Sequence, residues 1–267
     1  MNSDSSVFER ATGSTPLVVS FPHVGTEVPE DIAATLTEDG RRVADTDWHV
    51  DQLYSFVRDT GPAWLRARYS RYVIDLNRPP DDTTLYPGQT TTGLCPDVTF
   101  DGRPIYAGEA PTGQAVDRRR EQYWRPYHVA LGELIDAARQ RHGYAVLLDA
   151  HSIRSVVPRL FAGRLPDVNV GTNDGKSCAN SLSAKIMAVL AAQSTFSHVL
   201  NGRFKGGFIT RQYGNPSQRV HAVQLELAQS AYMNESGFLY DADRARPLRQ
   251  VLQTVVAALL AFRPEGA

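Results

Sequence analysis

Short apolar runs rich in β-branched residues alternate along this chain with longer segments of helical periodicity. Such alternation is typical of α/β folds, in which buried strands form a sheet and helices cover its faces. With 267 residues, the chain is long enough to bury a substantial core. We therefore expect residues 1–267 to form one α/β domain. The predicted strands are Leu17–Phe21, Tyr72–Leu76, Ala145–Leu148, Phe204–Thr210 and Ala222–Leu227.

The segments of helical periodicity carry apolar residues at spacings of three and four, which gives each predicted helix one buried stripe. In the longest segment this stripe includes Tyr127, Leu131 and Leu134, and in the last segment it includes Leu248 and Leu252. The predicted helices are Asp47–Arg58, Val116–Arg141, Cys178–Ala192 and Arg244–Phe262.

Two segments without periodicity are expected to be loops. The stretch from Pro79 to Pro111 is rich in Pro, Gly, Thr and Asp. Because loops this long inside a compact domain are often functional, we expect a lid or a wall that sets specificity. Asp167 to Gly175 is similar in composition to a calcium loop but lacks the terminal Glu, so it is interpreted as a loop rich in turns.

Composition and charge favour a small-molecule partner in the cytoplasm. The 28 basic and 29 acidic residues nearly cancel and are scattered, so no basic tract indicates nucleic-acid binding. The longest apolar run near the C-terminus, Val255–Phe262, is too short to span a membrane, and Met1–Ser14 lacks the features of a signal peptide. The two cysteines, Cys95 and Cys178, are expected to be reduced thiols.

Several predicted strands end in residues suited to metal binding or proton transfer. His23 follows the first strand, and His151 lies just beyond Ala145–Leu148. Asn77 and Arg78 follow a third apolar run. In open α/β sheets, ligands bind outside the carboxyl ends of the strands, so these side chains are candidates for one site. The alternative is that each histidine has an ordinary structural role.

A catalytic zinc usually has three protein ligands and one open position, so a third protein ligand is needed beside the two histidines. Asp47 begins a predicted helix near the edge of its apolar face and is our first choice. Asp51 lies further round the helix and is the second choice. The alternative for Asp47 is a cap at the start of the helix.

Glu226 is the candidate general base. In the segment Val223–Ala228 the apolar residues share one strand face, so Gln224 and Glu226 share the other. A carboxylate in an apolar strand is costly to bury without a partner, and accepting a proton from activated water would explain it. The alternative is that an arginine compensates the Glu226 charge.

Six blocks of sequence carry a family resemblance. They are Ser20-Phe21-Pro22-His23-Val24-Gly25-Thr26, Asp45-Thr46-Asp47-Trp48, Ser70-Arg71, Asp75-Leu76-Asn77-Arg78-Pro79-Pro80, Asp149-Ala150-His151-Ser152 and Gln224-Leu225-Glu226-Leu227. In order and spacing, over Leu17 to Tyr232, this set resembles the N-formylglutamate amidohydrolase family. The resemblance implies a three-layer fold with a mixed sheet between helices, similar to zinc carboxypeptidases and aspartoacylases, and therefore zinc-exopeptidase-like (phosphorylase/hydrolase-like).

The resemblance also implies roles for particular residues. His23 and His151 would bind Zn²⁺, Glu226 would be the base, and Asn77 with Arg78 would hold a substrate carboxylate. The relatives use a Glu as the middle metal ligand at a short spacing after the first His. That Glu is absent here, and Asp47 replaces it.

Two further arginines are candidates for substrate binding. Arg211 follows the predicted strand Phe204–Thr210, and Arg154 lies three residues beyond His151. Since the guanidinium fork suits carboxylates, Arg78 and Arg211 are predicted to bind the two carboxylates of an acidic substrate. Solvated surface arginines are the alternative reading of both additional positions.

The sequence thus predicts a zinc-dependent amidohydrolase that cleaves N-formyl-L-glutamate into formate and glutamate, the last step of histidine degradation in this family. Phosphate loops and Gly-x-Ser-x-Gly elbows are absent from the sequence, so NTP use and serine hydrolysis lose support. One alternative is a zinc hydrolase of another N-acyl amino acid or a short peptide. The other is a binding protein that keeps the fold without catalysis.

Overall fold

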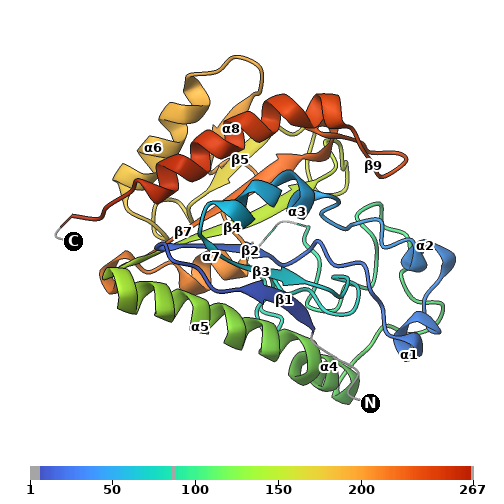
Figure 1. Cartoon of the computed structure of the whole chain (residues 1–267). Coiled ribbons are helices and arrows are strands. Elements are labelled where there is room, and N and C mark those ends of the chain that lie inside the picture. Colours follow the sequence, from blue (N-terminus) through green and yellow to red (C-terminus); the bar gives the residue numbers. More distant parts are fainter. Residues whose placement is uncertain (1–6, 86–87, 89, 266–267) are drawn as a thin grey trace.

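The computed structural model describes residues 7–85, 88 and 90–265, and its centre is a β-sheet between two layers of helices (Figure 1). The strands are β1 (Phe8–Ala11), β2 (Leu17–Phe21), β3 (Ala63–Ala67), β4 (Ala145–Ile153), β5 (Val168–Gly171), β6 (His198–Leu200), β7 (Val220–Ala228), β8 (Met233–Asn234) and β9 (Leu239–Tyr240). Within the described residues, one sheet has the order β1-β3-β2-β4-β7-β5-β6, and β8 pairs with β9 separately.

The sheet is mixed. Strands β3, β2, β4 and β7 run parallel, whereas β1 is antiparallel to β3 and β5 is antiparallel to β7. The parallel strands therefore bring their carboxyl ends to one edge of the sheet, where ligands bind in folds of this kind. The predicted three-layer α/β fold with a mixed central sheet is confirmed.

Helices cover both faces of the sheet (Figure 1). They are α1 (Glu30–Ala33), α2 (Glu38–Arg41), α3 (Val50–Leu53), α4 (Gln114–Arg119), α5 (Arg125–His142), α6 (Asn180–Ala191), α7 (Phe208–Tyr213) and α8 (Ala242–Leu260). Apolar side chains of α5 and α7 pack on one face, and those of α3, α6 and α8 pack on the other. The three longer predicted helices are thus present, with shifted ends.

Alternation along β4 explains where the polar residues of the sheet lie. Ala145 and Leu147 pack on the α5 face, while Val146 and Leu148 pack on the opposite face. Side chains two residues apart share a face of a strand, so Asp149 and His151 continue the row on the α5 side. All nine residues of β4 are buried, and these two polar side chains consequently need partners inside the protein.

The predicted strand Tyr72–Leu76 is wrong, because this buried segment consists of turns and irregular chain. Its backbone groups are paired outside any sheet. The Asp75 amide donates to the Leu94 carbonyl oxygen, and the Val73 carbonyl oxygen accepts from Arg119. The apolar content of this segment therefore reflects its burial and does not indicate a strand.

Three other local predictions are corrected by the structure. The predicted strand Phe204–Thr210 is a loop followed by α7, because Gly206 has a positive φ of 111° that breaks an extended chain. The predicted helix Asp47–Arg58 shrinks to α3 and the 3₁₀ turn Ser55–Asp59. The segment interpreted as a turn-rich loop contains strand β5.

The described residues contain neither a disulfide bond nor a membrane-spanning helix. Cys95 and Cys178 are both free thiols, as predicted. Every helix in the described ranges is too short or too polar to cross a membrane.

Candidate active site

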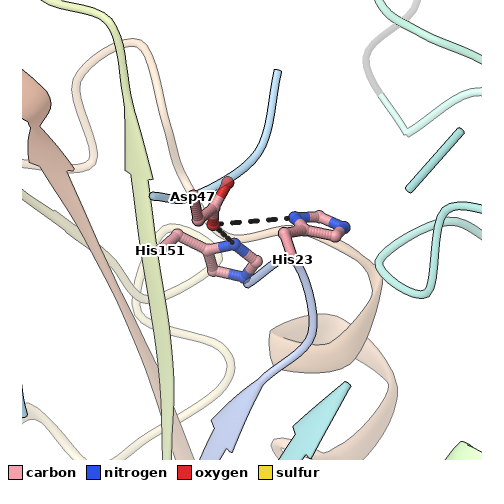
Figure 2. A group of neighbouring side chains, drawn as sticks. All are labelled: His23, Asp47 and His151. Carbon is pink, nitrogen blue, oxygen red and sulfur yellow. Dashed lines mark hydrogen bonds and ion pairs between the residues drawn. The ribbon is translucent and has the colours of Figure 1, made fainter. Parts of the chain in front are cut away.

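Three buried side chains meet at the carboxyl ends of the parallel strands (Figure 2). His23 lies two residues beyond β2, His151 lies in β4, and Asp47 lies in the segment before α3. Asp47 Oδ2 is 2.9 Å from His151 Nδ1 and 3.8 Å from His23 Nδ1. Each residue offers one ligand atom, and these atoms all lie within 4.8 Å of one another. The structure thus brings the three predicted ligands together.

Two further carboxylates orient the histidine rings. His23 Nε2 lies 2.7 Å from Asp75 Oδ1, and His151 Nε2 lies 3.0 Å from Asp149 Oδ2. The outer nitrogen of each ring is therefore held, while both Nδ1 atoms face Asp47. Metal-binding histidines usually donate their second N–H to a carboxylate in this way, which fixes the tautomer.

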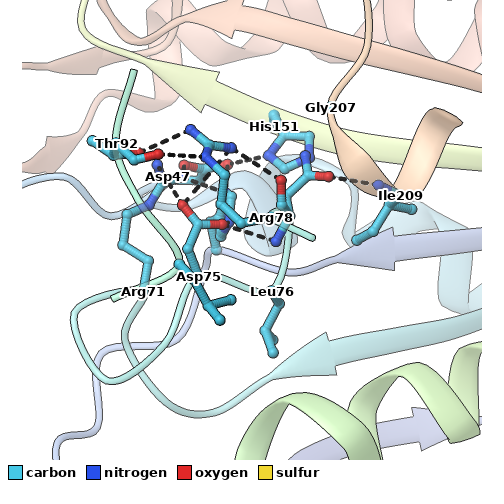
Figure 3. Close-up of polar contacts among 12 residues, drawn as sticks. Asp47, Arg71, Asp75, Leu76, Arg78, Thr92, His151, Gly207 and Ile209 are labelled. Carbon is cyan, nitrogen blue, oxygen red and sulfur yellow. Dashed lines mark hydrogen bonds and ion pairs between the residues drawn. The ribbon is translucent and has the colours of Figure 1, made fainter. Parts of the chain in front are cut away.

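The charge balance of this cluster favours a bound cation. Asp47, Asp75 and Asp149 are fully buried. A buried guanidinium, that of Arg71, donates to Asp47 Oδ1 at 2.9 Å and also contacts His23 Nδ1 (Figure 3). A guanidinium thus contacts two of the three candidate ligands, so this position attracts positive charge. A divalent ion would compensate the remaining negative charge.

Burial and charge shift the pKa values of the three candidate ligands. Burial and Arg71 lower the pKa of His23, against the effect of Asp75. Burial alone would lower the pKa of His151, but the carboxylates of Asp149 and Asp47 outweigh it and raise the pKa well above its usual value. Burial would raise the pKa of Asp47, yet Arg71 and the two histidines hold it below its usual value.

Glu226 lies beside His151 on the neighbouring strand. The register of β4 and β7 pairs His151 with Glu226 and Asp149 with Gln224. Gln224 Nε2 donates to Glu226 Oε2 at 3.0 Å, and Gln224 Oε1 accepts from the Gly207 amide at 2.7 Å. Burial raises the pKa of the Glu226 carboxyl to about 8. A carboxyl with this environment can exchange a proton near neutral pH.

A pocket opens onto this cluster. Its lining includes His23, His151 and Glu226, together with the guanidinium groups of Arg71, Arg78 and Arg203. Thr90, Thr91 and Thr92 supply another part of the lining. They belong to the stretch between Pro79 and Pro111, of which residues 86, 87 and 89 lie outside the described part of the chain. This stretch therefore contributes to the wall of the pocket.

Asn77 and Arg78 both line the pocket, and hydrogen bonds hold both side chains in place. Asn77 Nδ2 lies 3.0 Å from His151 Nε2, and Asn77 Oδ1 accepts from the Ile209 amide at 2.8 Å. Arg78 donates from Nε to the Thr92 carbonyl oxygen and from Nη2 to the Thr92 hydroxyl, both at 2.8 Å. Asn77 thus connects the candidate metal centre with the start of α7, and Arg78 connects it with the pocket wall.

The other predicted residues lie elsewhere. Arg154 pairs with Asp101 at 2.7 Å, and Arg211 Nε donates to the Gly206 carbonyl oxygen at 2.8 Å. Neither arginine is among the described residues that line the pocket. Asp51, the second choice for the metal, accepts from Arg66 at 2.7 Å. Asp47 is consequently the acid that joins the two histidines.

Several residues of the site had no predicted role. Asp149 could have been found, because it lies two residues before His151 and therefore on the same strand face. Asp75 and Arg71 are part of the blocks that carry the family resemblance, but their partners are distant in sequence. Arg203 had no signal, since it lies in a loop without periodicity.

A mixed α/β sheet with this buried cluster, a neighbouring carboxyl and an open pocket is an arrangement suited to a hydrolytic enzyme. Residues 15–233 match the sequence model of the family described as N-formylglutamate amidohydrolase. The chain belongs to this family. It is 52% identical, over 95% of its length and 96% of the relative, to an N-formylglutamate deformylase of Pseudomonas aeruginosa. The corresponding protein of Pseudomonas putida is 51% identical over 95% of each chain.

A solved structure supports the same assignment, and a second one supports the fold. The crystal structure of an N-formylglutamate amidohydrolase from Ralstonia eutropha matches with a TM-score of 0.79 and 30% identity, covering 94% of this chain and 97% of the other. A gene product of Agrobacterium tumefaciens matches with a TM-score of 0.71 at 18% identity, covering 95% and 96%. The second likeness concerns the fold alone.

Proposed function

We propose that this enzyme hydrolyses the formamide bond of N-formyl-L-glutamate, releasing formate and L-glutamate with one Zn²⁺ per chain. The observation that carries the proposal is the buried group of His23, Asp47 and His151, with Glu226 beside it on the pocket. The names of the Pseudomonas relatives, which are 51–52% identical over nearly the whole chain, support the substrate.

The donor set fits zinc. Two imidazole nitrogens and one carboxylate oxygen are common ligands of catalytic zinc, and three protein ligands leave a position open. When bound, Zn²⁺ supplies a Lewis acid that polarises a carbonyl group and lowers the pKa of water to about 7. Asp75 and Asp149 hold the rings of His23 and His151 so that Nδ1 of each faces Asp47, the third candidate ligand.

Glu226 serves as the general base and then as the general acid. Its carboxylate takes a proton from the water that attacks the formyl carbon. As the C–N bond breaks, the same carboxyl delivers that proton to the departing amine nitrogen. Its position next to His151 in the paired strand and its place in the pocket lining support this role.

Arg71 stabilises the negative charge that develops on the formyl oxygen. It is the buried guanidinium nearest to the candidate ligands, with contacts to both Asp47 and His23. A fixed cation in a buried site stabilises such charge far better than a solvated one. Arg71 lines the pocket, so a bound carbonyl group can reach it.

The substrate is doubly anionic, and the pocket is rich in guanidinium groups. Arg78 binds one substrate carboxylate, with Asn77 beside it, as the family resemblance implies. The placement of Arg154 and Arg211 outside the described lining gives no support to their predicted substrate contacts. A cytoplasmic role in histidine degradation remains a prediction from the resemblance.

Formate release from a panel of N-formyl and N-acetyl amino acids tests the proposal. With zinc present, kcat/KM should be highest for N-formylglutamate and much lower for N-formylmethionine and N-formylglutamine, because a neutral side chain leaves a pocket cation unpaired. A chelator should abolish the activity, and added zinc should restore it.

Other outcomes identify the alternatives. Equal rates on acidic and neutral formyl substrates would reject the acidic pocket and keep a zinc hydrolase of broader range. Release of acetate in preference to formate would indicate another N-acyl amino acid as substrate. Binding of these compounds without any hydrolysis would favour a binding protein that keeps the fold.

A further inference from the structure

The pocket contains two guanidinium groups that share one wall. Arg78 donates two hydrogen bonds to Thr92, and Arg203 Nη2 donates to the Thr90 carbonyl oxygen at 3.3 Å. Both arginines line the pocket, and so do Thr90, Thr91 and Thr92 between them in sequence. The two cations therefore contact the Thr90–Thr92 run from the same pocket. The hydroxyls of Thr90 and Thr91 take no part in these hydrogen bonds of Arg78 and Arg203.

Arg203 is held firmly, as a residue that sets specificity must be. Its Nε donates to the Leu160 carbonyl oxygen at 2.9 Å. Its guanidinium carbon lies 5.3 Å from the ring centroid of Phe204, which also lines the pocket. A guanidinium positioned by backbone oxygens and an aromatic ring loses little entropy when it binds a carboxylate.

The two arginines differ in their relation to the candidate metal centre. Arg78 Nη1 lies 4.0 Å from Asp75 Oδ2, and Asp75 holds the His23 ring. Arg78 is also the chain neighbour of Asn77, which contacts His151. Arg203 instead donates to the carbonyl oxygens of Leu160 and Thr90, in two loops around the pocket. Arg78 is thus the guanidinium closer to the reacting bond.

N-formylglutamate presents its two carboxylates at different distances from the reacting bond. The α-carboxylate is attached to the carbon that bears the formamide nitrogen, while the side-chain carboxylate is separated from that carbon by two methylene groups. We propose that Arg203, with the Thr90–Thr92 wall, binds the side-chain carboxylate, and that Arg78 binds the α-carboxylate. This inference rests on the proposed function and assigns to Arg203 the role predicted for Arg211.

The test compares N-formylglutamate with N-formylglutamine, which has the same shape and a neutral side chain. In the Arg203→Gln variant, the ratio of the two kcat/KM values should fall by about 10²-fold. A site whose buried polar group pairs with a substrate group strongly rejects the analogue that lacks that group, and the variant loses this rejection. The fall should come from a higher KM for N-formylglutamate. Calorimetric binding of L-glutamate, measured against L-glutamine, should show the same loss of preference.

Two comparison variants make the test decisive. Lys205→Gln removes a positive charge two residues away, where Lys205 pairs with Asp174 outside the pocket lining, and it should leave the ratio unchanged. Arg211→Gln tests the earlier assignment. The inference is overturned if Arg203→Gln keeps the wild-type ratio, if it weakens both substrates equally, or if Arg211→Gln alone lowers the ratio. Failure of the wild-type enzyme to release formate from either substrate would reject the proposed function itself.

Discussion

His151 and Glu226 occupy paired positions on the adjacent parallel strands β4 and β7. Side chains at paired positions of neighbouring strands lie on the same face, so the candidate metal ligand and the candidate base project toward the same pocket. The strands are buried along their whole length, which fixes this register against slippage. The backbone ladder thereby sets the separation between metal ligand and base.

The first prediction concerns the base. In Glu226→Gln the side chain keeps its size but cannot accept the proton, so kcat should fall by at least about 10²-fold. Zinc content and thermal stability should stay close to wild type, because none of the three candidate ligands is changed. Activity close to that of the wild type would mean that another group takes the proton.

A second prediction concerns the metal. Purified His151→Ala should lose most of its zinc by elemental analysis, since it removes one of three ligands. His221→Gln is the matched control. His221 is a buried histidine whose Nδ1 accepts from the Ala179 amide, away from the pocket lining, so its variant should retain about one zinc per chain. Full zinc retention in His151→Ala would exclude this residue from the metal site.

Tyr232 is predicted to tune metal affinity without contacting the metal. Its hydroxyl lies 2.7 Å from the Trp48 carbonyl oxygen and 2.8 Å from the Ser152 hydroxyl. The Ser152 amide in turn donates to Asp47 Oδ2. Loss of such outer contacts typically weakens metal binding at least about 10-fold, which Tyr232→Phe should show in competition with a zinc chelator.

Another buried tyrosine provides the control for Tyr232. The Tyr54 hydroxyl is fully buried and has no hydrogen-bond partner among the described residues. Tyr54→Phe should therefore leave zinc affinity unchanged and should not destabilise the fold. Equal zinc affinity in Tyr232→Phe and Tyr54→Phe would show that the Tyr232 contacts do not position Asp47.

The sequence was most informative where one strand carries several residues of the site. The apolar runs before His23 and His151 predicted β2 and β4. The alternation along β7 placed Glu226 on the strand face opposite to the apolar residues. Asp47 was chosen from a helix that is much shorter than predicted, and the structure places it in the segment before α3. The residue joins the cluster, although the geometry used to select it was wrong.

Sequence patterns failed where tertiary contacts replace the regular backbone hydrogen bonds. Tyr72–Leu76 has the apolar content of a strand, yet Arg119 and the Leu94 backbone satisfy its polar groups in turns. Arg203 and Thr90 are 113 positions apart and meet through two loops. Neither local propensity nor periodicity encodes such a meeting. The Pro79–Pro111 stretch is the loop expected to form a lid or a wall, but the contribution of Arg203 to this wall was not predictable.

The pH dependence of stability should depend on His128. Its Nε2 donates to the Leu76 carbonyl oxygen and its ring stacks on Trp124. Burial lowers the pKa of His128 to about 4. Between this value and its unfolded pKa near 6.5, the unfolded chain binds more protons, so stability decreases as the pH falls through this window.

His128→Gln isolates that contribution. From pH 8 to pH 5, the wild-type free energy of unfolding should fall by about 2 kcal/mol more than that of the variant. Chemical denaturation at the two pH values measures this difference, and other titrating groups cancel in the comparison. Equal losses in both proteins would mean that His128 titrates normally in the folded state.

The last prediction concerns the contact between Gly207 and Asn77. A Cβ added to Gly207 would overlap the Asn77 side-chain amide, which contacts His151 and accepts from the Ile209 amide. Gly207→Ala should therefore displace Asn77, and kcat/KM should fall by about 10²-fold, since small misplacements in a site have effects of this size. Gly132→Ala is the control, because a Cβ there meets no atom within 4 Å and alanine favours a helix interior by about 1 kcal/mol. That variant should be fully active and slightly more stable. If Gly207→Ala were equally active, the Asn77 amide would not need its present position for catalysis.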